Sequence, residues 1–119
     1  MARRKPKRRL PKPEVETARY TDAEGNVLEL RTSLSPATIA KIGEPPSAAA
    51  ASLEDAWQRR EELLFERLAV SWEIAGLPIT EQKMLLGRYR LASHDERRWV
   101  RGTIADHCER HIPELAGDR

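Results

Sequence analysis

Three side chains near the end of the chain have the chemistry of metal ligands. His107 and His111 are four residues apart, which places them on one face of a helix, and Cys108 adds a thiol. A zinc site needs further ligands, but the sequence holds only one other histidine, His94, and no second cysteine. In the segment 107–111, His-Cys-Glu-Arg-His, the glutamate is at the third position. The metalloprotease motifs His-Glu-x-x-His and His-x-x-Glu-His have it at the second and at the fourth, so the segment matches neither. We therefore expect histidines near the negative end of a helix dipole and no metal site.

A cysteine next to a histidine is also a pairing used by thiol nucleophiles. Cys108 adjoins His107, but consecutive residues of a helix point about 100° apart, so the imidazole is badly placed to activate the thiol. The acidic pairs at 54–55 and 61–62 occupy predicted helix-surface positions, where solvated charge is the expected role. The six glycines form no phosphate-binding loop. We predict that the protein is not an enzyme and uses no cofactor.

Basic side chains are concentrated at the N-terminus. Residues 1–12 hold seven of the 21 basic residues and none of the 19 acidic ones, so the rest of the chain carries a net charge of −5. A cationic segment suits contacts with phosphates, but this one has no aromatic residue to stack on bases, so its nucleic-acid binding would be non-specific. A tether to an acidic protein, a solubilising tail and a misplaced translation start are the alternatives. The seven residues are Arg3, Arg4, Lys5, Lys7, Arg8, Arg9 and Lys12.

The same N-terminal segment is poor in apolar side chains. Residues 1–17 contain three prolines and only two large aliphatic side chains, Leu10 and Val15. Because so little apolar surface cannot offset the entropy lost on ordering, we predict a disordered basic arm over residues 1–17.

Residues 18–32 have the pattern of a β-hairpin. Tyr20 begins the first strand, and Leu28 and Leu30 share one face of the second, with charged neighbours on the other face. The loop at 22–26 contains a glycine and an asparagine, which tolerate positive φ. Since an isolated hairpin is only marginally stable in water, its apolar face should pack against helices.

A short helix is predicted to begin at Ser35-Pro36 and to end at Gly43. Serine is a favoured N-cap, and proline is favoured at the first helical position. Residues 44–51, Glu-Pro-Pro-Ser followed by four alanines, are predicted to form a linker; the alternative is that the alanines extend the next helix backward.

The longest predicted helix covers residues 53–75. A capping box at Ser52 and Asp55 would begin it, and Gly76 followed by Pro78 would end it. Apolar residues at spacings of 7, 4, 4 and 3 form one face over about six turns. They are Trp57, Leu64, Leu68, Trp72 and Ala75.

Two further helices are predicted at 81–91 and 94–111. Thr80 caps the first, and Ser93 with Glu96 forms a capping box for the second, which ends before a proline. The side chains expected to face inward are Met84, Leu85 and Tyr89 in the first helix, and Trp99, Val100 and Ile104 in the second.

Aromatic residues follow the helical spacing and have two interpretations. They would form a stacking platform for bases or pack in the core, and the spacing favours the core. Leu68 and Trp72 are expected at its centre. Trp57, near a helix start, is expected to be partly exposed and to form with Phe65 a surface for a partner protein.

Length and composition restrict the class of protein. A chain of 119 residues is enough for one domain, and its single cysteine excludes an internal disulfide. No signal peptide or apolar run of about 20 residues is found, so we expect a cytoplasmic protein without a membrane partner. The predicted fold is α+β, mainly α: a three-helix body at 18–113 with a docked N-terminal β-hairpin, the disordered arm 1–17, and a polar tail at 114–119.

The order of these elements resembles that of the small tail-assembly chaperones of long-tailed bacteriophages. In that family the chaperone coats the tape-measure protein while the tail tube polymerises. The resemblance covers residues 18–113 and lies in the layout, since no diagnostic motif is shared; the basic arm departs from it. The residues that suggest it are a hairpin with Gly25, Val27, Leu28 and Leu30, followed by Leu34-Ser35-Pro36 and a helical body.

Two functional hypotheses follow. The first is a non-enzymatic protein-interaction or assembly factor, chaperone-like, whose body binds another protein with an elongated helical form. The alternative is non-specific nucleic-acid binding through residues 1–12. The sequence leaves the oligomeric state open.

Overall fold

The first hairpin forms where the alternating pattern predicts it. In the computed structural model, which describes residues 16–44 and 53–116, β1 (Thr17–Thr21) pairs antiparallel with β2 (Val27–Arg31). The side chain of Asp22 accepts hydrogen bonds from the backbone N–H groups of Glu24 and Asn26, both at 2.9 Å, and closes the turn. Gly25 has a φ of 86°, which a residue without Cβ adopts freely.

A second hairpin replaces the end of the predicted helix 53–75, and that prediction was wrong beyond residue 68. Helix α2 (Leu53–Leu68) is followed at once by β3 (Ala69–Ile74) and β4 (Leu77–Ile79). The turn between the strands has positive φ at both central residues, Ala75 at 53° and Gly76 at 81°, as hairpin turns of two residues favour. The glycine taken for a helix cap is therefore a hairpin residue.

The error has a physical reason. The spacing of four between Leu64, Leu68 and Trp72 matches one helical turn, but four is also an even number, so it matches a strand equally well. Pairing with the first hairpin decides between them, because Leu28 lies opposite Trp72 and Leu30 opposite Ala69 in adjacent strands. The sheet has four antiparallel strands in the order β1-β2-β3-β4.

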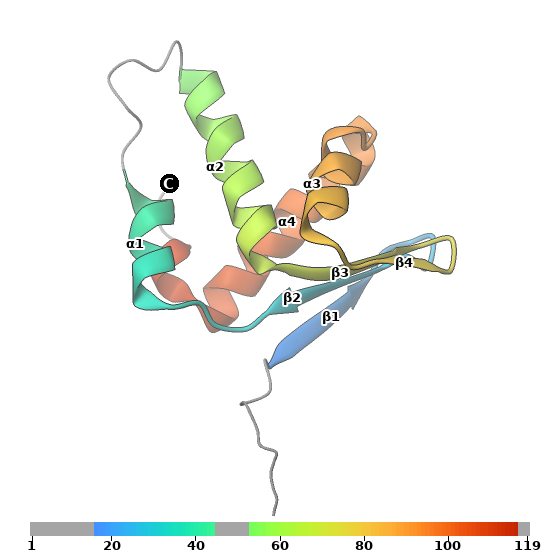
Figure 1. Ribbon diagram of the computed structural model, residues 1–119, viewed down its shortest axis with the longest axis horizontal. Coiled ribbons are helices and arrows are strands. Elements are labelled where there is room, and N and C mark those ends of the chain that lie inside the picture. The colour runs from blue at the N-terminus through green and yellow to red at the C-terminus, as the bar shows by residue number, and fades with distance from the viewer. Residues whose placement is uncertain (1–15, 45–52, 117–119) are drawn as a thin grey trace, which may run out of the picture.

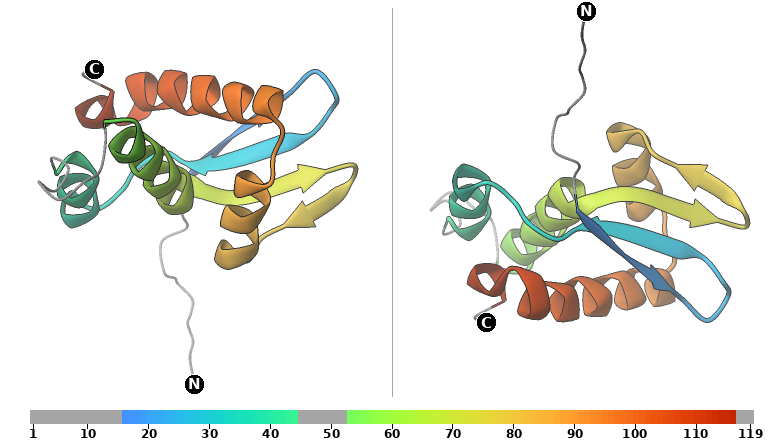
Figure 2. Two further views of the ribbon diagram at one scale, coloured as in Figure 1. Left: turned by 90° about the horizontal axis from the view of Figure 1, so that it is seen from above. Right: turned by 90° about the horizontal axis from the view of Figure 1, so that it is seen from below.

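The helices all lie on one face of this sheet (Figures 1 and 2). The prediction of an α+β fold with a docked hairpin is confirmed. The description as a three-helix body is not matched exactly, because the described residues form four helices, the short one at 36–43 included, and a second hairpin. The boundary between the arm and the hairpin was predicted after residue 17. Thr17 already pairs with Arg31 in β1, so the hairpin begins one residue earlier than predicted. Residues 1–15, with the basic arm, and 45–52, with most of the linker and Ser52, lie outside the described residues.

Helix α1 (Pro36–Gly43) has the predicted bounds, and Ser35 accepts a hydrogen bond from the Thr38 N–H at 3.1 Å. Helix α3 (Gln82–Arg90) begins one residue later than predicted, and its N-cap residue is Glu81, not Thr80. Leu85 and Tyr89 face inward as predicted, whereas Met84 is 58% exposed and does not.

Helix α4 (His94–His111) has the predicted bounds, and both hydrogen bonds of the Ser93–Glu96 capping box are present. A 3₁₀ turn, η2 (Pro113–Leu115), follows it and brings Leu115 into the core. The folded body therefore continues past residue 113, and the expected polar tail 114–119 is wrong at this position. Helix and tail together close one end of the core.

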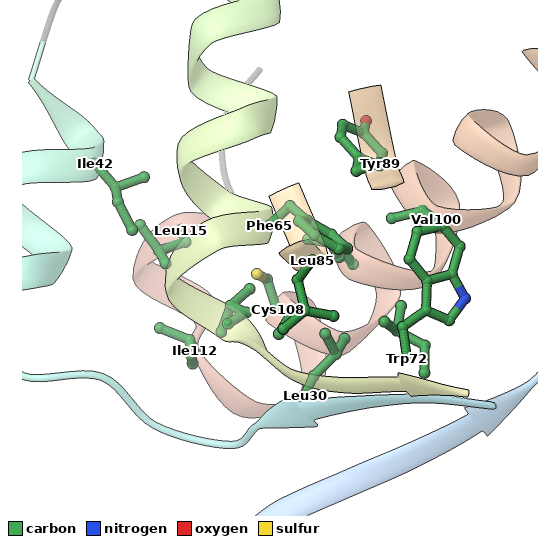
Figure 3. Packing of buried hydrophobic residues seen from close by; sticks show 14 of the residues in the cluster. Leu30, Ile42, Phe65, Trp72, Leu85, Tyr89, Val100, Cys108, Ile112 and Leu115 are labelled. Carbon is green, nitrogen blue, oxygen red and sulfur yellow. The ribbon is translucent and has the colours of Figure 1, made fainter. Parts of the chain in front are cut away.

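The core lies between the sheet and the helices (Figure 3). Leu68 and Trp72 are buried at its centre, as predicted. Phe65 joins three elements, because its ring stacks on Tyr89 of α3 at 4.7 Å and meets Trp72 of β3 edge-on at 5.7 Å between ring centroids. This contact fixes the position of α3 and therefore of the Tyr89 side chain at the surface of the core.

Candidate functional site

Helix α2 meets the sheet only at its C-terminal end and rises away from it towards its N-terminus (Figure 1). Its first half therefore has no strand beneath it, and a cleft of about 280 Å³ opens between α2, α4 and η2. The apolar side chains of this cleft come from all three elements: Trp57, Leu64, Ile104, Ala105, Cys108, Leu115 and Ala116.

Trp57 is the largest side chain of the cleft and is 47% exposed. The other two tryptophans differ from it, since Trp72 is buried and Trp99 packs against the core. Other large apolar side chains are exposed, among them Leu77, Met84 and Leu91, but none of these three lines the cleft. Trp57 thus combines a large apolar surface with an adjoining hollow.

The cleft continues past Trp57 into a polar region of about 620 Å³ between α2, α3 and α4. The two hollows share Trp57, Glu61, Tyr89 and Arg101, so they form one groove with an apolar end and a polar end. The further residues of the polar end are Gln58, Glu62, Arg90, His94 and Arg97.

Burial and opposite charges act together at the polar end. The Glu61 carboxylate lies 3.4 Å from Nε of Arg101, and Glu62 lies 2.8 Å from Arg90. Burial raises the pKa of Glu61, while the nearby Arg101 and Arg97 oppose that rise. Burial, and secondly the Glu61 charge, raises the pKa of Tyr89, so its phenol stays protonated and keeps a donor at neutral pH.

A different arrangement surrounds His107, which is fully buried. One ring nitrogen, Nε2, lies 2.7 Å from the Arg31 carbonyl oxygen, to which it donates in the neutral ring. The other, Nδ1, then accepts from the Tyr20 hydroxyl at 2.6 Å. Burial lowers the pKa of His107, which favours this neutral form. Both nitrogens are therefore occupied in holding α4 to the first hairpin.

Of the residues that first suggested chemistry, His107 has a structural role in these contacts. Of the residues described, no group of three or more His, Cys, Asp or Glu side chains lies close enough to hold a metal ion. Cys108 points to the cleft side of α4 while His107 points to the hairpin, as expected from adjacent helical positions. Burial raises the pKa of Cys108 to about 11, so the thiol is not ionised at neutral pH and is a poor nucleophile.

The two residues expected to share a partner surface are separated by the fold. Trp57 is partly exposed in the cleft, as expected, whereas Phe65 is fully buried and cannot contact a partner. Phe65 lies eight residues further along α2, where the helix has reached the sheet and the ring packs on Tyr89. The candidate contact residues at 3–12 lie outside the described residues.

Sequence reasoning missed the polar end of the cleft. Arg97 and Arg101 are four residues apart, as are Trp57 and Glu61, so each pair shares a helix face. These spacings were visible, but which two faces would meet depends on the packing of α2 against α4. The acidic pair at 61–62 was assigned to solvent, whereas both carboxylates bind arginines of other helices.

No family model, curated protein or solved structure matches this chain. The roles of its residues therefore rest on their geometry. Over the ranges that the structure describes, no helix is long and apolar enough to cross a membrane.

Proposed function

We propose that the protein is a non-enzymatic interaction factor that binds a segment of another protein in the cleft between α2 and α4. The observation that carries this proposal is the exposure of Trp57 over a hollow with apolar walls. Removal of apolar surface from water contributes about 25 cal/mol per Å², so a partner side chain that covers this ring gains binding energy.

The residue types of the cleft support the same interpretation. Tryptophan, tyrosine and arginine are the residues that most often dominate protein–protein binding energies. Trp57, Tyr89 and Arg101 adjoin one another around the point where the apolar and polar ends meet. An apolar region and a polar region side by side provide the two kinds of contact that protein–protein interfaces combine.

A helix is the best occupant for a groove of this form. The walls are themselves helices, and an amphipathic helix fills such a groove with side chains at i, i+3 and i+4. More specifically, we propose that this binding serves an assembly role similar to that of phage tail-assembly chaperones. The order of the elements, a hairpin, a short helix and then the remaining helices, supports this role. The neighbouring genes test this level: a tail-tube gene upstream and a tape-measure gene downstream would support it, and a ribosomal or replication neighbourhood would count against it.

The binding proposal is tested by affinity capture from native lysate at 50 and 200 mM salt. Wild type is compared with Trp57→Ala, with the matched control Leu91→Ala, and with a variant lacking residues 1–12. Leu91 is 84% exposed and lies outside the cleft, so its loss removes apolar surface without touching the proposed site.

We expect one protein to be retained by wild type, Leu91→Ala and the shortened chain at both salt concentrations, and to be lost with Trp57→Ala. Binding through a cleft that buries apolar surface depends weakly on salt. Binding of nucleic acid through several phosphate contacts would fall by about two to three orders of magnitude over this range. Recovery of nucleic acid alone, and only with residues 1–12 present, would overturn the proposal in favour of the basic arm.

A further inference from the structure

We propose that Arg97 and Arg101 form a carboxylate-recognition site that selects a partner helix bearing an acidic side chain next to its apolar anchors. This inference rests on the proposed function, because it specifies which helix the cleft binds. It concerns the polar end of the cleft, where α4 faces the first half of α2.

Arg97 and Arg101 both line the same hollow, the polar end of the cleft. They are one turn apart on α4. Both also lie close enough to the Glu61 carboxylate and the Tyr89 hydroxyl to alter the pKa of each. Two planar donor groups around one hollow match the two oxygens of a carboxylate.

The donors of these arginines are incompletely used within the described part of the chain. Arg88 makes two hydrogen bonds to Glu96, at 3.2 and 2.9 Å, whereas Arg101 approaches Glu61 only at 3.4 Å through Nε. A guanidinium has five N–H donors, of which Arg101 directs Nε at Glu61 and another at the Tyr89 hydroxyl, so donors remain for a further carboxylate oxygen. Among the side chains described, those of residues 16–44 and 56–116, Arg97 has no ion pair within 4.0 Å.

Charge complementarity identifies the occupant as acidic. The described side chains at the polar end include three arginines, at positions 90, 97 and 101, against two glutamates, at 61 and 62. The chain outside residues 1–12 has a net charge of −5. The described side chains of the polar end therefore have an excess of one positive charge, on a body with a net negative charge, and this excess favours a carboxylate at this place.

The position of the site next to Trp57 determines the pattern that it would read. The apolar and polar ends share four residues, so a side chain one or two turns along a bound helix from its apolar anchors would reach the arginines. Apolar contacts would supply affinity. The arginines would supply specificity, because a helix with a carboxylate at this position would be attracted and one with a lysine there would be repelled by their positive charges.

The test is selection from a displayed library of amphipathic helical peptides with one randomised polar position per turn. The baits are wild type, Arg97→Glu with Arg101→Glu, and Trp57→Ala. The control is Arg98→Glu, which reverses one charge, half the change of the double variant, at an exposed position on the same helix that does not line the cleft. Melting temperatures of all baits are measured first, and Arg97→Gln with Arg101→Gln replaces the reversed pair if that variant unfolds.

Wild type and Arg98→Glu are expected to enrich peptides with Asp or Glu at one fixed distance from the apolar anchors. The variant with Arg97→Glu and Arg101→Glu is expected to enrich peptides with Lys or Arg at that position. The variant with Arg97→Gln and Arg101→Gln is expected to show no preference for either charge. A synthetic acidic peptide should bind the reversed pair at least about tenfold more weakly than wild type, a loss of about 1.4 kcal/mol. Changing its acid to lysine should recover the difference.

The outcomes separate this inference from the proposed function. If wild type enriches apolar helices over Trp57→Ala but shows no charge preference, the carboxylate site is wrong and the cleft still binds a protein segment. If wild type enriches nothing over Trp57→Ala, both proposals are overturned. An acidic preference that is equally strong in the reversed pair would place recognition elsewhere and also refute the inference.

Discussion

Two adjacent faces of helix α4 make contrasting contacts. On one face, His107 is fully buried, and both of its ring nitrogens have partners in the first hairpin, within 2.7 Å. On the other face, about a quarter turn away, Arg97 and Arg101 border a cleft that leaves Trp57 half exposed. We call the first the closed face, because its buried polar atoms all have hydrogen-bond partners, and the second the open face, because it borders a solvent-accessible cleft.

The difference shows which polar residues stabilise the fold and which are available for binding. A buried histidine with two short hydrogen bonds has no capacity left for a ligand. Arg97 and Arg101 lie near a single carboxylate, Glu61, and retain donors, and the half-exposed Trp57 retains apolar surface. The side-chain types of His107 and its neighbours first suggested chemistry, and the spacing argued against it; the contacts of His107 add that both of its ring nitrogens are in use.

Substitution of the core residue Leu68 should give the largest effect on stability. It is fully buried at the junction of α2 and β3, where the helix meets the sheet. Leu68→Ala is expected to reduce the free energy of unfolding by about 2–5 kcal/mol through lost burial and the cavity left behind. Urea denaturation measures the change. A change below about 0.5 kcal/mol would show that this junction does not hold the core together.

Breaking only the closed face should cost less. His107→Leu leaves the Tyr20 hydroxyl and the Arg31 carbonyl without their partner, with an expected loss of about 1–3 kcal/mol of stability. Combining it with Tyr20→Phe should give a double-mutant coupling of about 0.5–3 kcal/mol, since the two side chains share a hydrogen bond. Strict additivity of the two losses would contradict the closed contact.

Acid should weaken the same face. The pKa of His107 is lowered by burial from the ordinary 6.5, so the unfolded chain takes up a proton first as pH falls. Stability is therefore full above about pH 6.5 and declines below it, by at most about 1.4 kcal/mol per pH unit, until the folded-state pKa is passed. The nearby Arg110 and His111 add to the cost of a second positive charge.

Denaturation between pH 7.5 and 5 measures this dependence, with His107→Gln as the control that keeps a donor and an acceptor but does not titrate. The range stops at pH 5 because Arg88 lowers the pKa of Glu96, which adds its own loss of stability in stronger acid. Equal slopes for wild type and His107→Gln would show that His107 is not the group responsible.

The smallest expected effect on stability is at the open face. Trp57→Ala should reduce the free energy of unfolding by about 1 kcal/mol, because the ring is 47% exposed and only its buried part loses contacts. Thermal melting against wild type measures it. A loss as large as that of Leu68→Ala would mean that Trp57 belongs to the core rather than to a binding site.

Local signals predicted the elements that depend on local chemistry. The Ser93–Glu96 box and Ser35-Pro36 determine helix starts through their own backbone, so α1 and α4 have the predicted bounds. The first hairpin was likewise predictable from alternation and its turn.

Features that depend on distant pairing were not predictable in this way. Residues 69–75 satisfy helix and strand periods together, and only their pairing with β2 selects the strand. The cleft depends on two helix faces meeting across 40 residues of sequence, so Trp57 could be recognised as exposed but Arg97 and Arg101 could not be placed beside it. The partners of His107, 76 and 87 residues away, were equally beyond a local pattern.

Photo-crosslinking tests most directly the claim that the open face of α4 binds a protein. A photoreactive amino acid is introduced at position 57 in the cleft, or at the exposed position 19 on the face of the sheet that carries no helix, and native lysate is irradiated. The account predicts a crosslink to one partner protein from position 57 and none from position 19. Crosslinks of equal yield from both positions, or from position 19 alone, would contradict it.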